Sequence, residues 1–298
     1  MTKIYSHSKI SSFEQCPLKF KLKYIDRLKP DIEKTIEAHL GSCVHDSLEW
    51  LYTQIKNYQN TPLLDKLIEY FSTKWQKEMT QDTVIIKQDM TEKDYFNKGV
   101  EFLISYYMKN HPFNDGTIEC EKKIMLDLDE KGEYKIIGYI DRLAINPETG
   151  KYEIHDYKTA NNMPEKKSIE KDRQLALYSI AIKEIFEIPF SEEIDLIWHY
   201  LAHNQKIHSK RTDSEIEQLK KETLEKIKEI EAATEQEDFP ACTSILCNWC
   251  EFKETCKEIQ KAQSFKKAQE AVQECYFKSK NSDFKTKDNS KNNELDIW

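Results

Sequence analysis

The chain has 298 residues, of which 39% are hydrophobic and 33% charged, and its formal net charge is −8. This composition is typical of a folded, heavily solvated protein and excludes a chain that is disordered throughout. No apolar run approaches the roughly 20 residues of a membrane span, and the N-terminal segment has no apolar signal core, so we expect a cytoplasmic protein without membrane contact.

Apolar residues recur every three or four positions from residue 9 to residue 27, which predicts an amphipathic helix that Pro17 bends or restarts. The same periodicity predicts further helices over residues 43–58, 63–79, 93–109, 168–186 and 213–232. Strand patterns cover residues 117–127, 134–145, 151–158 and 194–202. This order predicts an α/β fold, with a central sheet flanked by helices. Residues 277–298 are polar and aperiodic, and we expect them to form a disordered tail.

The turn-forming segment NPETG, at residues 146–150, separates the second and third predicted strands. If the turn is centred between Glu148 and Thr149, paired residues have numbers that sum to 297, and Asp141 faces Asp156. Opposed carboxylates repel each other, and alternation places Lys158 on the face of Asp156. Two carboxylates and an ammonium at one point suit Mg²⁺ or Mn²⁺ and a water beside the ion.

Two alternatives to this interpretation stay open at the level of spacing alone. Asp156 and Lys158 form an ordinary surface ion pair in the first. In the second, a slip of one residue in the hairpin sends the two aspartates to opposite faces of the sheet. A further set of motifs is needed to decide.

Five motifs in order resemble those of the PD-(D/E)xK nuclease superfamily, and most closely its RecB-like branch, which includes AddB-type nucleases and CRISPR-associated exonucleases. They are SKISSFEQCPLKFKLKY at residues 8–24, GSCVH at 41–45, GYID at 138–141, DYKT at 156–159 and QLALY at 174–178. The resemblance spans residues 8–256. It implies a restriction-endonuclease-like core with a central mixed sheet. Ile140 stands where the superfamily often has a proline, a change that is common in the RecB-like branch.

The resemblance also implies roles for individual residues. Asp141 and Asp156 would bind Mg²⁺ or Mn²⁺, assisted by His45 and the backbone carbonyl of Tyr157. Lys158 would position or activate the attacking water. Gln174 and Tyr178 are four apart, so on a helix they share a face and would hold the substrate backbone or the lysine. Without the resemblance, Tyr178 is a core residue, Gln174 a surface residue and His45 an ordinary helix histidine.

The domain organisation follows from these motifs. We expect one nuclease domain over residues 1–276, with a helical insert at about 50–112, a catalytic core at about 113–203 and a cysteine-rich metal segment at 240–258. The tail at 277–298 would lie outside it.

The segment CTSILCNWCEFKETC, at residues 242–256, has cysteine spacing typical of a metal site in a reducing compartment. Zinc held by Cys242, Cys247, Cys250 and Cys256 is one interpretation. The other is a 4Fe-4S cluster held by Cys16, Cys247, Cys250 and Cys256, and the resemblance to iron-sulfur RecB-like nucleases favours it. Cys16 is otherwise a buried apolar thiol. Such a cluster would act as a structural staple between the two ends of the chain.

Two basic runs are candidates for contact with DNA. The first contains Lys19, Lys23 and Arg27, and the second contains Lys210 and Arg211. Phe20 and Tyr24 lie among the first group and suit stacking on unpaired bases. Solvated helix faces explain the same residues without DNA. The last five residues, ELDIW, resemble peptides that dock on bacterial sliding clamps, so a replication partner is a hypothesis for the tail.

The sequence therefore predicts a Mg²⁺- or Mn²⁺-dependent DNA nuclease, in particular an exonuclease on single-stranded ends, with an iron-sulfur or zinc site. Repair, recombination, phage replication and CRISPR adaptation are all compatible settings. The alternative is a non-catalytic DNA-binding or scaffold protein that keeps the nuclease fold and a structural metal site. The absence of a GxxxxGK[ST] motif excludes a built-in P-loop motor.

Overall fold

A computed structural model describes residues 2–165, 169 and 172–261. It divides the chain into two compact units, Met1–Cys242 and Thr243–Trp298. We describe each unit by itself. The predicted tail at residues 277–298, including the ELDIW peptide, lies outside the described residues.

The first unit begins with the short strand β1 (Lys3–Ser6) and the helix α1 (His7–Gln15). Ser6 caps α1 by accepting a hydrogen bond from the backbone N–H of Lys9 at 3.2 Å. Cys16 is extended, with φ −164°, and Pro17 starts the next helix, α2 (Pro17–Phe20), which continues as a π-helix over Lys21–Ile25. The predicted restart at Pro17 is confirmed, and its reason is that proline fits the first turn of a helix, where its missing N–H costs nothing.

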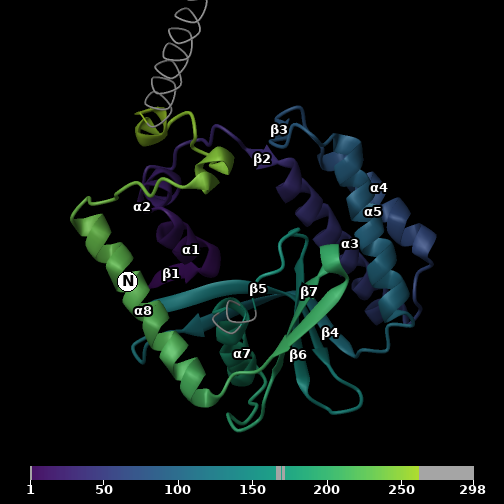
Figure 1. Ribbon diagram of the computed structural model, residues 1–298. Helices are drawn as coiled ribbons and strands as arrows, with labels where there is room; N and C mark the ends of the chain where they lie inside the picture. Colours follow the sequence, from purple (N-terminus) through teal and green to yellow (C-terminus); the bar gives the residue numbers. More distant parts are fainter. Residues whose placement is uncertain (1, 166–168, 170–171, 262–298) are drawn as a thin grey trace, which may run out of the picture. The chain divides into compact units, whose positions relative to one another are not determined.

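Three long helices form the predicted helical region: α3 (Ile36–Tyr58), α4 (Leu64–Glu78) and α5 (Glu92–Asn110). They pack side by side in Figure 1 and share one hydrophobic core. Two-residue strands β2 (Lys34–Thr35) and β3 (Thr83–Val84) pair in parallel near them. Thr91 and Asp94 form a reciprocal capping box at the start of α5, which fixes where that helix begins.

Within the described residues, six strands form one mixed sheet with the order β1-β5-β6-β7-β8, and β4 pairs with β5 off that path. The longer strands are β4 (Thr117–Asp127), β5 (Tyr134–Ile145), β6 (Tyr152–Lys158) and β7 (Asp195–Tyr200). They match the predicted strands closely. The prediction missed β1 and the edge strand β8 (Gln205–Ser209), which follows a 3₁₀ turn at Leu201–His203.

The β5–β6 hairpin has the predicted register, since Arg142 pairs with His155 and Ile145 with Tyr152, and both pairs sum to 297. The side chain of Asn146 accepts hydrogen bonds from the backbone N–H groups of Glu148, at 2.9 Å, and Thr149, at 3.1 Å. Gly150 has φ +70°, a conformation that glycine adopts without strain. The turn residues therefore set the register, and the alternative of a one-residue slip is wrong.

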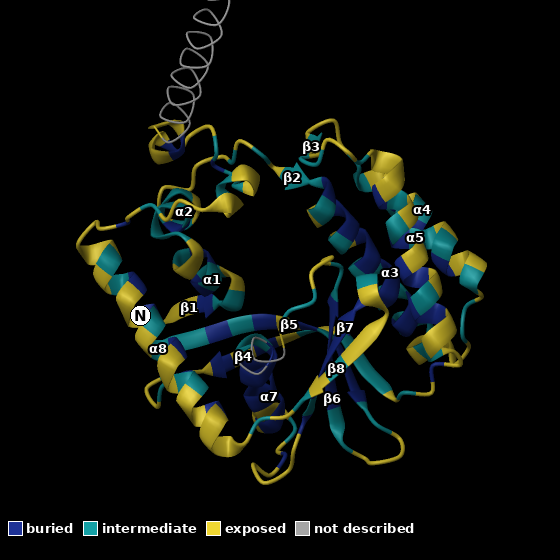
Figure 2. Cartoon of the chain, in the orientation of Figure 1, coloured by how far each residue is buried: buried dark blue, intermediate teal, exposed yellow. Residues whose placement is uncertain are grey.

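Helices α7 (Gln174–Ile185) and α8 (Asp213–Glu235) share a hydrophobic core with the sheet. Nearly the whole of α7 is buried, whereas α8 exposes a long stripe, as the colours of Figure 2 show. A second core joins α3, α4 and α5 to Tyr157 of β6 and Leu201. The expected central mixed sheet flanked by helices is confirmed.

The described part of the second unit contains a 3₁₀ segment, Ile245–Trp249, and a buried Phe252. The described helices of both units include none that is long and apolar enough to cross a bilayer.

Candidate active site

The site lies where β5 changes partners. One edge of β5 pairs with β1 as far as Ile137 and with β6 from Arg142 onward, while β4 occupies the other edge. Residues 138–141 therefore lie between two ladders on the first edge. Asp141 is the last residue of this gap, and it is placed beside the end of β6 without being locked into a ladder pair.

The Asp141 carboxylate joins three elements. Its Oδ2 accepts a hydrogen bond from the backbone N–H of Tyr157 at 2.8 Å. The same oxygen lies 3.4 Å from Nδ1 of His45, which comes from α3. The other ring nitrogen, Nε2, donates to the Tyr157 carbonyl at 2.7 Å. The structure thus brings together Asp141, His45 and the Tyr157 carbonyl, as the sequence motifs imply.

Burial alone would lower the pKa of His45, but the hydrogen bond and the charge of Asp141 outweigh it and raise the pKa to about 9. The helix can approach this closely because position 41 is glycine: a Cβ there would lie 3.3 Å from Oγ1 of Thr159, just after β6. The glycine of the GSCVH motif therefore serves helix-to-strand packing.

Asp156 and Lys158 alternate onto one face of β6 and form an ion pair. Lys158 Nζ lies 3.0 Å from Oδ1 and 2.8 Å from Oδ2 of Asp156. Burial, together with repulsion from Asp141, raises the pKa of Asp156 to about 6. Burial would lower the pKa of Lys158, but the Asp156 carboxylate outweighs it, so the pKa is raised and the lysine is charged at neutral pH.

The Asp156 side chain keeps capacity for a cation. Its Oδ2 is buried and has no hydrogen bond of acceptable geometry, although the lysine is near. A buried carboxylate oxygen left in this state costs free energy, and a bound divalent ion would recover it. The ion pair that the alternative interpretation expects is present, but it is not an ordinary surface pair, because only 5% of the Asp156 side chain is exposed.

Glu121 is a site residue that the sequence analysis missed. Single ligand atoms of His45, Glu121 and Asp141 all lie within 4.8 Å of one another. Glu121 lies in β4 opposite this cluster and has φ +48°, a left-handed conformation rare for glutamate. Burial and the charge of Asp141 raise its pKa to about 7. Asp156 does not belong to this group, since its carboxylate faces Lys158.

No simple sequence signal marks Glu121. It stands before Lys122 and Lys123 in a strand, where an acid among lysines is typical of a solvated surface. The register of β4 and β5 places it across from Asp141, between the pairs Cys120–Arg142 and Lys122–Ile140. The group of His45, Glu121 and Asp141 has one imidazole and two carboxylates, and the Tyr157 carbonyl and the Asp156 carboxylate lie nearby. These donors are mostly oxygen, which fits Mg²⁺ or Mn²⁺.

Gln174 and Tyr178 come from the first two turns of α7. Tyr178 packs on Gly138 so closely that a Cβ at position 138 would lie 2.3 Å from its ring. Burial raises the pKa of the Tyr178 hydroxyl, and hydrogen bonds with Gln174 and the backbone of Tyr139 oppose that rise. The glycine of GYID and the tyrosine of QLALY are therefore one packing pair beside the site.

The candidate DNA-binding residues differ in the ion pairs and hydrogen bonds that they form within the protein. Lys210 pairs with Glu193 at 2.7 Å and lies 3.6 Å from Asp195. Arg211 donates to the carbonyls of Ile169, at 2.7 Å, and Lys210, at 3.0 Å. In the N-terminal run, Lys19 donates to Gln15 at 3.2 Å, Lys23 lies 5.8 Å from the Tyr24 ring centre, and Arg27 has φ +52°.

The cysteines of the proposed metal site lie in both units. In the first unit, Cys16 separates α1 from α2, and its sulfur accepts a hydrogen bond from the backbone N–H of Cys242 at 3.4 Å. In the second, the backbone N–H of Ser244 donates to the sulfur of Cys247 at 3.3 Å, and Cys256 is buried.

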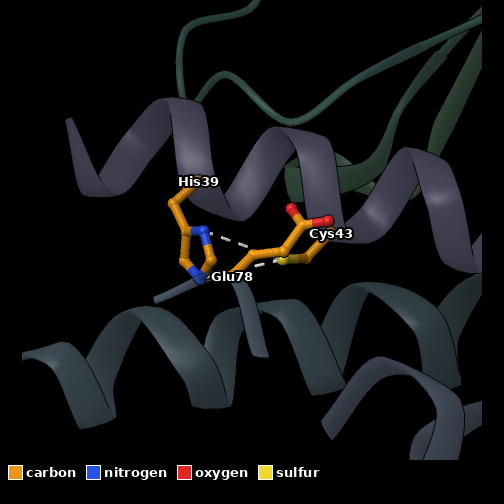
Figure 3. Close-up of side chains that lie close together, drawn as sticks. All are labelled: His39, Cys43 and Glu78. Atoms are coloured by element: carbon orange, nitrogen blue, oxygen red, sulfur yellow. Dashed lines mark hydrogen bonds between the residues drawn. The ribbon is translucent and has the colours of Figure 1, made fainter. Parts of the chain in front are cut away.

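A second cluster of possible ligands lies between α3 and α4, formed by His39, Cys43 and Glu78 (Figure 3). The Cys43 sulfur lies 3.7 Å and 3.9 Å from the two ring nitrogens of His39, so it faces the ring rather than one lone pair. Glu78 already has Lys74 at 2.8 Å and Lys34 at 3.7 Å. Burial raises the pKa of the Cys43 thiol to about 11, and we interpret this cluster as a polar contact of the core.

Fold and site together define a nuclease-type α/β protein. The profile of the PD-(D/E)XK nuclease superfamily matches residues 4–257. Because this match covers most of the chain, the protein belongs to the PD-(D/E)XK nuclease superfamily, and the restriction-endonuclease-like fold expected from the motifs is confirmed. No curated protein matches the sequence.

Among solved structures, one described as the crystal structure of SSO0001 aligns with 81% of this chain and 94% of its own length. The aligned residues are 15% identical and the TM-score is 0.34. A likeness of this strength carries no argument about function.

Proposed function

We propose that this protein is a Mg²⁺- or Mn²⁺-dependent deoxyribonuclease that acts as an exonuclease on single-stranded DNA ends. The observation that carries the proposal is the convergence of Asp141, Asp156 and Lys158 at the point where β5 changes partners. Asp156 is buried there with an oxygen that lacks a hydrogen bond, and Asp141 lies beside His45 and Glu121. Like charges held this close favour a bound cation.

The ion would be held by Asp141, Asp156, His45 and the Tyr157 carbonyl, with Glu121 beside them. His45 has a raised pKa, so it would release a proton when the ion binds, because only a neutral imidazole is a ligand. When bound, it supplies charge that polarises the scissile phosphate and lowers the pKa of a water. Lys158 has a raised pKa and carries a proton at neutral pH, so its role is to position the water and offset phosphate charge rather than to accept a proton. Gln174 and Tyr178, whose side chains bond to each other, would hold the substrate backbone or the lysine.

The test uses a labelled linear single strand and a circular single strand, each incubated with Mn²⁺ and the full chain. We expect wild type to degrade only the linear strand, and Lys158→Ala to lose about 100-fold or more of the rate. Lys135→Ala is the matched control, because Lys135 also forms an ion pair with an aspartate, Asp127, from within the sheet. It should cleave like wild type.

Three results contradict parts of the proposal. Cleavage of the circle refutes an exonuclease, and a preference for duplex or RNA refutes the assignment of substrate. If wild type cleaves nothing at any Mn²⁺ concentration, the non-catalytic DNA-binding or scaffold alternative replaces the enzyme.

We further propose that Cys16, Cys247, Cys250 and Cys256 hold a 4Fe-4S cluster. Backbone N–H groups donate to two of these sulfurs, those of Cys16 and Cys247, and such bonds stabilise thiolate ligands. Anaerobically purified protein should show broad visible absorption and contain iron. Cys250→Ser should lose the iron and Cys120→Ser should keep it. A colourless protein loaded with zinc would favour the alternative set that uses Cys242.

The tail peptide at residues 294–298 is proposed to recruit the enzyme to a sliding clamp, on the strength of its sequence alone. Deleting these residues should abolish capture by an immobilised clamp, while scrambling residues 277–293 should leave capture intact. Equal capture of the deleted and intact chains would reject this partner.

A further inference from the structure

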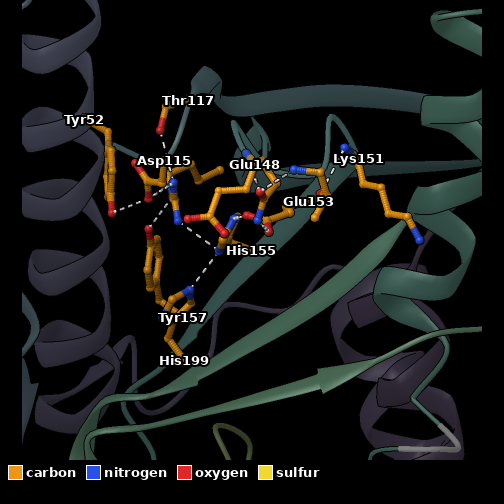
Figure 4. A network of polar contacts seen from close by, with 12 residues as sticks. Tyr52, Asp115, Thr117, Glu148, Lys151, Glu153, His155, Tyr157 and His199 are labelled. Atoms are coloured by element: carbon orange, nitrogen blue, oxygen red, sulfur yellow. Dashed lines mark hydrogen bonds and ion pairs between the residues drawn. The ribbon is translucent and has the colours of Figure 1, made fainter. Parts of the chain in front are cut away.

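Arg142 of β5 is the centre of a network of polar side chains, and Figure 4 labels its partners Asp115, Thr117, His155 and Tyr157. Only 1% of Arg142 is exposed. Its guanidinium donates to the Tyr157 hydroxyl at 3.0 Å, to Thr117 at 3.1 Å, to His155 at 2.9 Å and to the Asp115 carboxylate. The Tyr52 ring centre lies 4.1 Å from its central carbon. A buried cation with this many partners is held in one orientation.

The hydrogen bonds of this network run in one consistent direction. Arginine only donates, so Nδ1 of His155 must accept from it. His199 therefore carries its hydrogen on Nε2 and donates to the same Nδ1 at 2.9 Å. His155 carries its own hydrogen on Nε2 and donates to Glu153 at 3.1 Å. Both imidazoles are neutral, and burial holds the pKa of each well below its ordinary value.

Tyr157 connects this network to the candidate active site. Its hydroxyl accepts from Arg142 on one face of the sheet. Its backbone N–H donates to Asp141 at 2.8 Å, and its carbonyl accepts from His45 at 2.7 Å. The β5–β6 ladder ends at the Arg142–His155 pair. Beyond that pair, no further backbone pair of the ladder joins the two strands within the described residues. The hydrogen bond from the Arg142 guanidinium to the Tyr157 hydroxyl links the end of β6 to β5 instead.

We propose that Arg142 and the Tyr157 hydroxyl are positioning groups that set the divalent-metal affinity of the site. This inference rests on the proposed function and adds a claim about how the site is held. Arg142 contacts neither the substrate nor the ion. It fixes the Tyr157 ring, and the ring fixes the backbone that carries one ligand carbonyl and orients the Asp141 carboxylate. Partners of this kind change metal affinity by about 10- to 100-fold when removed.

The test compares Tyr157→Phe with Tyr95→Phe. Both tyrosines are buried, and each loses one hydroxyl bonded to a charged side chain, since Tyr95 donates to Glu37 at 2.6 Å. Binding of Mn²⁺ is followed by loss of the electron paramagnetic resonance signal of the free ion, and the nuclease rate is measured against Mn²⁺ concentration. We expect Tyr157→Phe to bind Mn²⁺ about 10-fold more weakly. Its rate should recover at saturating Mn²⁺, and Tyr95→Phe should match wild type.

A purely structural role predicts another pattern. Both variants would then lose similar thermal stability and bind Mn²⁺ as wild type does, which would overturn the inference and leave the proposed function standing. Arg142→Lys is a second variant, which keeps the charge and loses the fork of donors; it should weaken Mn²⁺ binding in the same direction. If wild type binds no Mn²⁺, the proposed function fails and the inference fails with it.

Discussion

The two faces of the β5–β6 hairpin use charged residues in opposite ways. On one face, Arg142, His155 and Tyr157 bond to one another and to their neighbours, and each of these side chains has a partner. On the other, Asp141 and Asp156 repel each other, and an oxygen of Asp156 has no hydrogen bond. The same alternation of a strand therefore places three partnered side chains and a repelling pair of carboxylates one residue apart, although Oδ1 of Asp115, beside Arg142, also lacks a hydrogen bond. We call the face of Arg142, His155 and Tyr157 the satisfied face, and its hydrogen bonds hold the hairpin rigid. The face of Asp141 and Asp156 is the unsatisfied face, and it is the one that can bind a ligand.

The largest effect that we expect is on the free energy of unfolding, and it appears when one cation on each face, Arg142 or Lys158, is replaced by methionine. Arg142→Met removes the donor that the buried His155 and Tyr157 share with the partly exposed Asp115, so we expect the free energy of unfolding to fall by about 3–5 kcal/mol. Lys158→Met should cost much less stability, because its carboxylate partner has a raised pKa and can take up a proton. Urea unfolding of the two variants at pH 7 measures the difference. Equal losses would contradict the contrast between the faces.

Acid should damage the satisfied face first. The pKa values of His155 and His199 lie well below 6.5 in the folded protein, so below pH 6.5 the unfolded chain binds more protons than the folded one. Stability is then lost as pH falls, by up to about 1.4 kcal/mol per pH unit for each histidine. Urea midpoints between pH 7.5 and 5 measure this loss. His199→Gln should flatten the profile, and the exposed His203→Gln should leave it unchanged.

The two motif glycines offer a sharper comparison of packing near the site. A Cβ at Gly138 would lie 2.3 Å from the Tyr178 ring, whereas one at Gly41 would lie 3.3 Å from the Thr159 hydroxyl. Gly138→Ala should therefore destabilise the fold by about 1–3 kcal/mol through overpacking. Gly41→Ala should cost less, since a hydroxyl rotates more easily than a ring moves. Thermal melts of the metal-free proteins rank the two, and the reverse order would refute the packing argument.

Much of the fold followed from local chemistry. The turn NPETG fixed the hairpin register because the Asn146 side chain and Gly150 specify the chain reversal by themselves. The helices followed from apolar periodicity. Strand β1 did not, because its four residues acquire strand character only by pairing in parallel with β5, more than a hundred positions away. Strand β8 is a short, polar edge strand, which alternation does not reveal.

The site was predictable to the extent that motifs recorded it. Hairpin register and strand alternation named Asp141, Asp156 and Lys158, and the motif resemblance added His45. The structure places them near one another. Glu121 was missed because it comes opposite Asp141 only through the pairing of β4 with β5. Arg142 was missed for a different reason: a strand arginine reads as a surface residue, and only tertiary packing shows that it is buried.

The smallest effect that we expect concerns Glu121, which lies beside Asp141 of the unsatisfied face. Its carboxylate lowers the stability of the metal-free protein and favours metal binding. Its pKa is raised to about 7, so between pH 4.5 and 7 the unfolded chain releases this proton before the folded one does, and stability falls as pH rises. Glu121→Gln should therefore melt slightly higher than wild type above pH 7 without metal, and no higher below pH 4.5. It should also bind Mn²⁺ more weakly.

Glu119→Gln is the control, since that carboxylate pairs with Lys122 at 2.8 Å. A Glu121→Gln protein that melts lower than wild type at pH 8 would show that the carboxylate is not held against its own repulsion, and the contrast between the two faces would lose its clearest example.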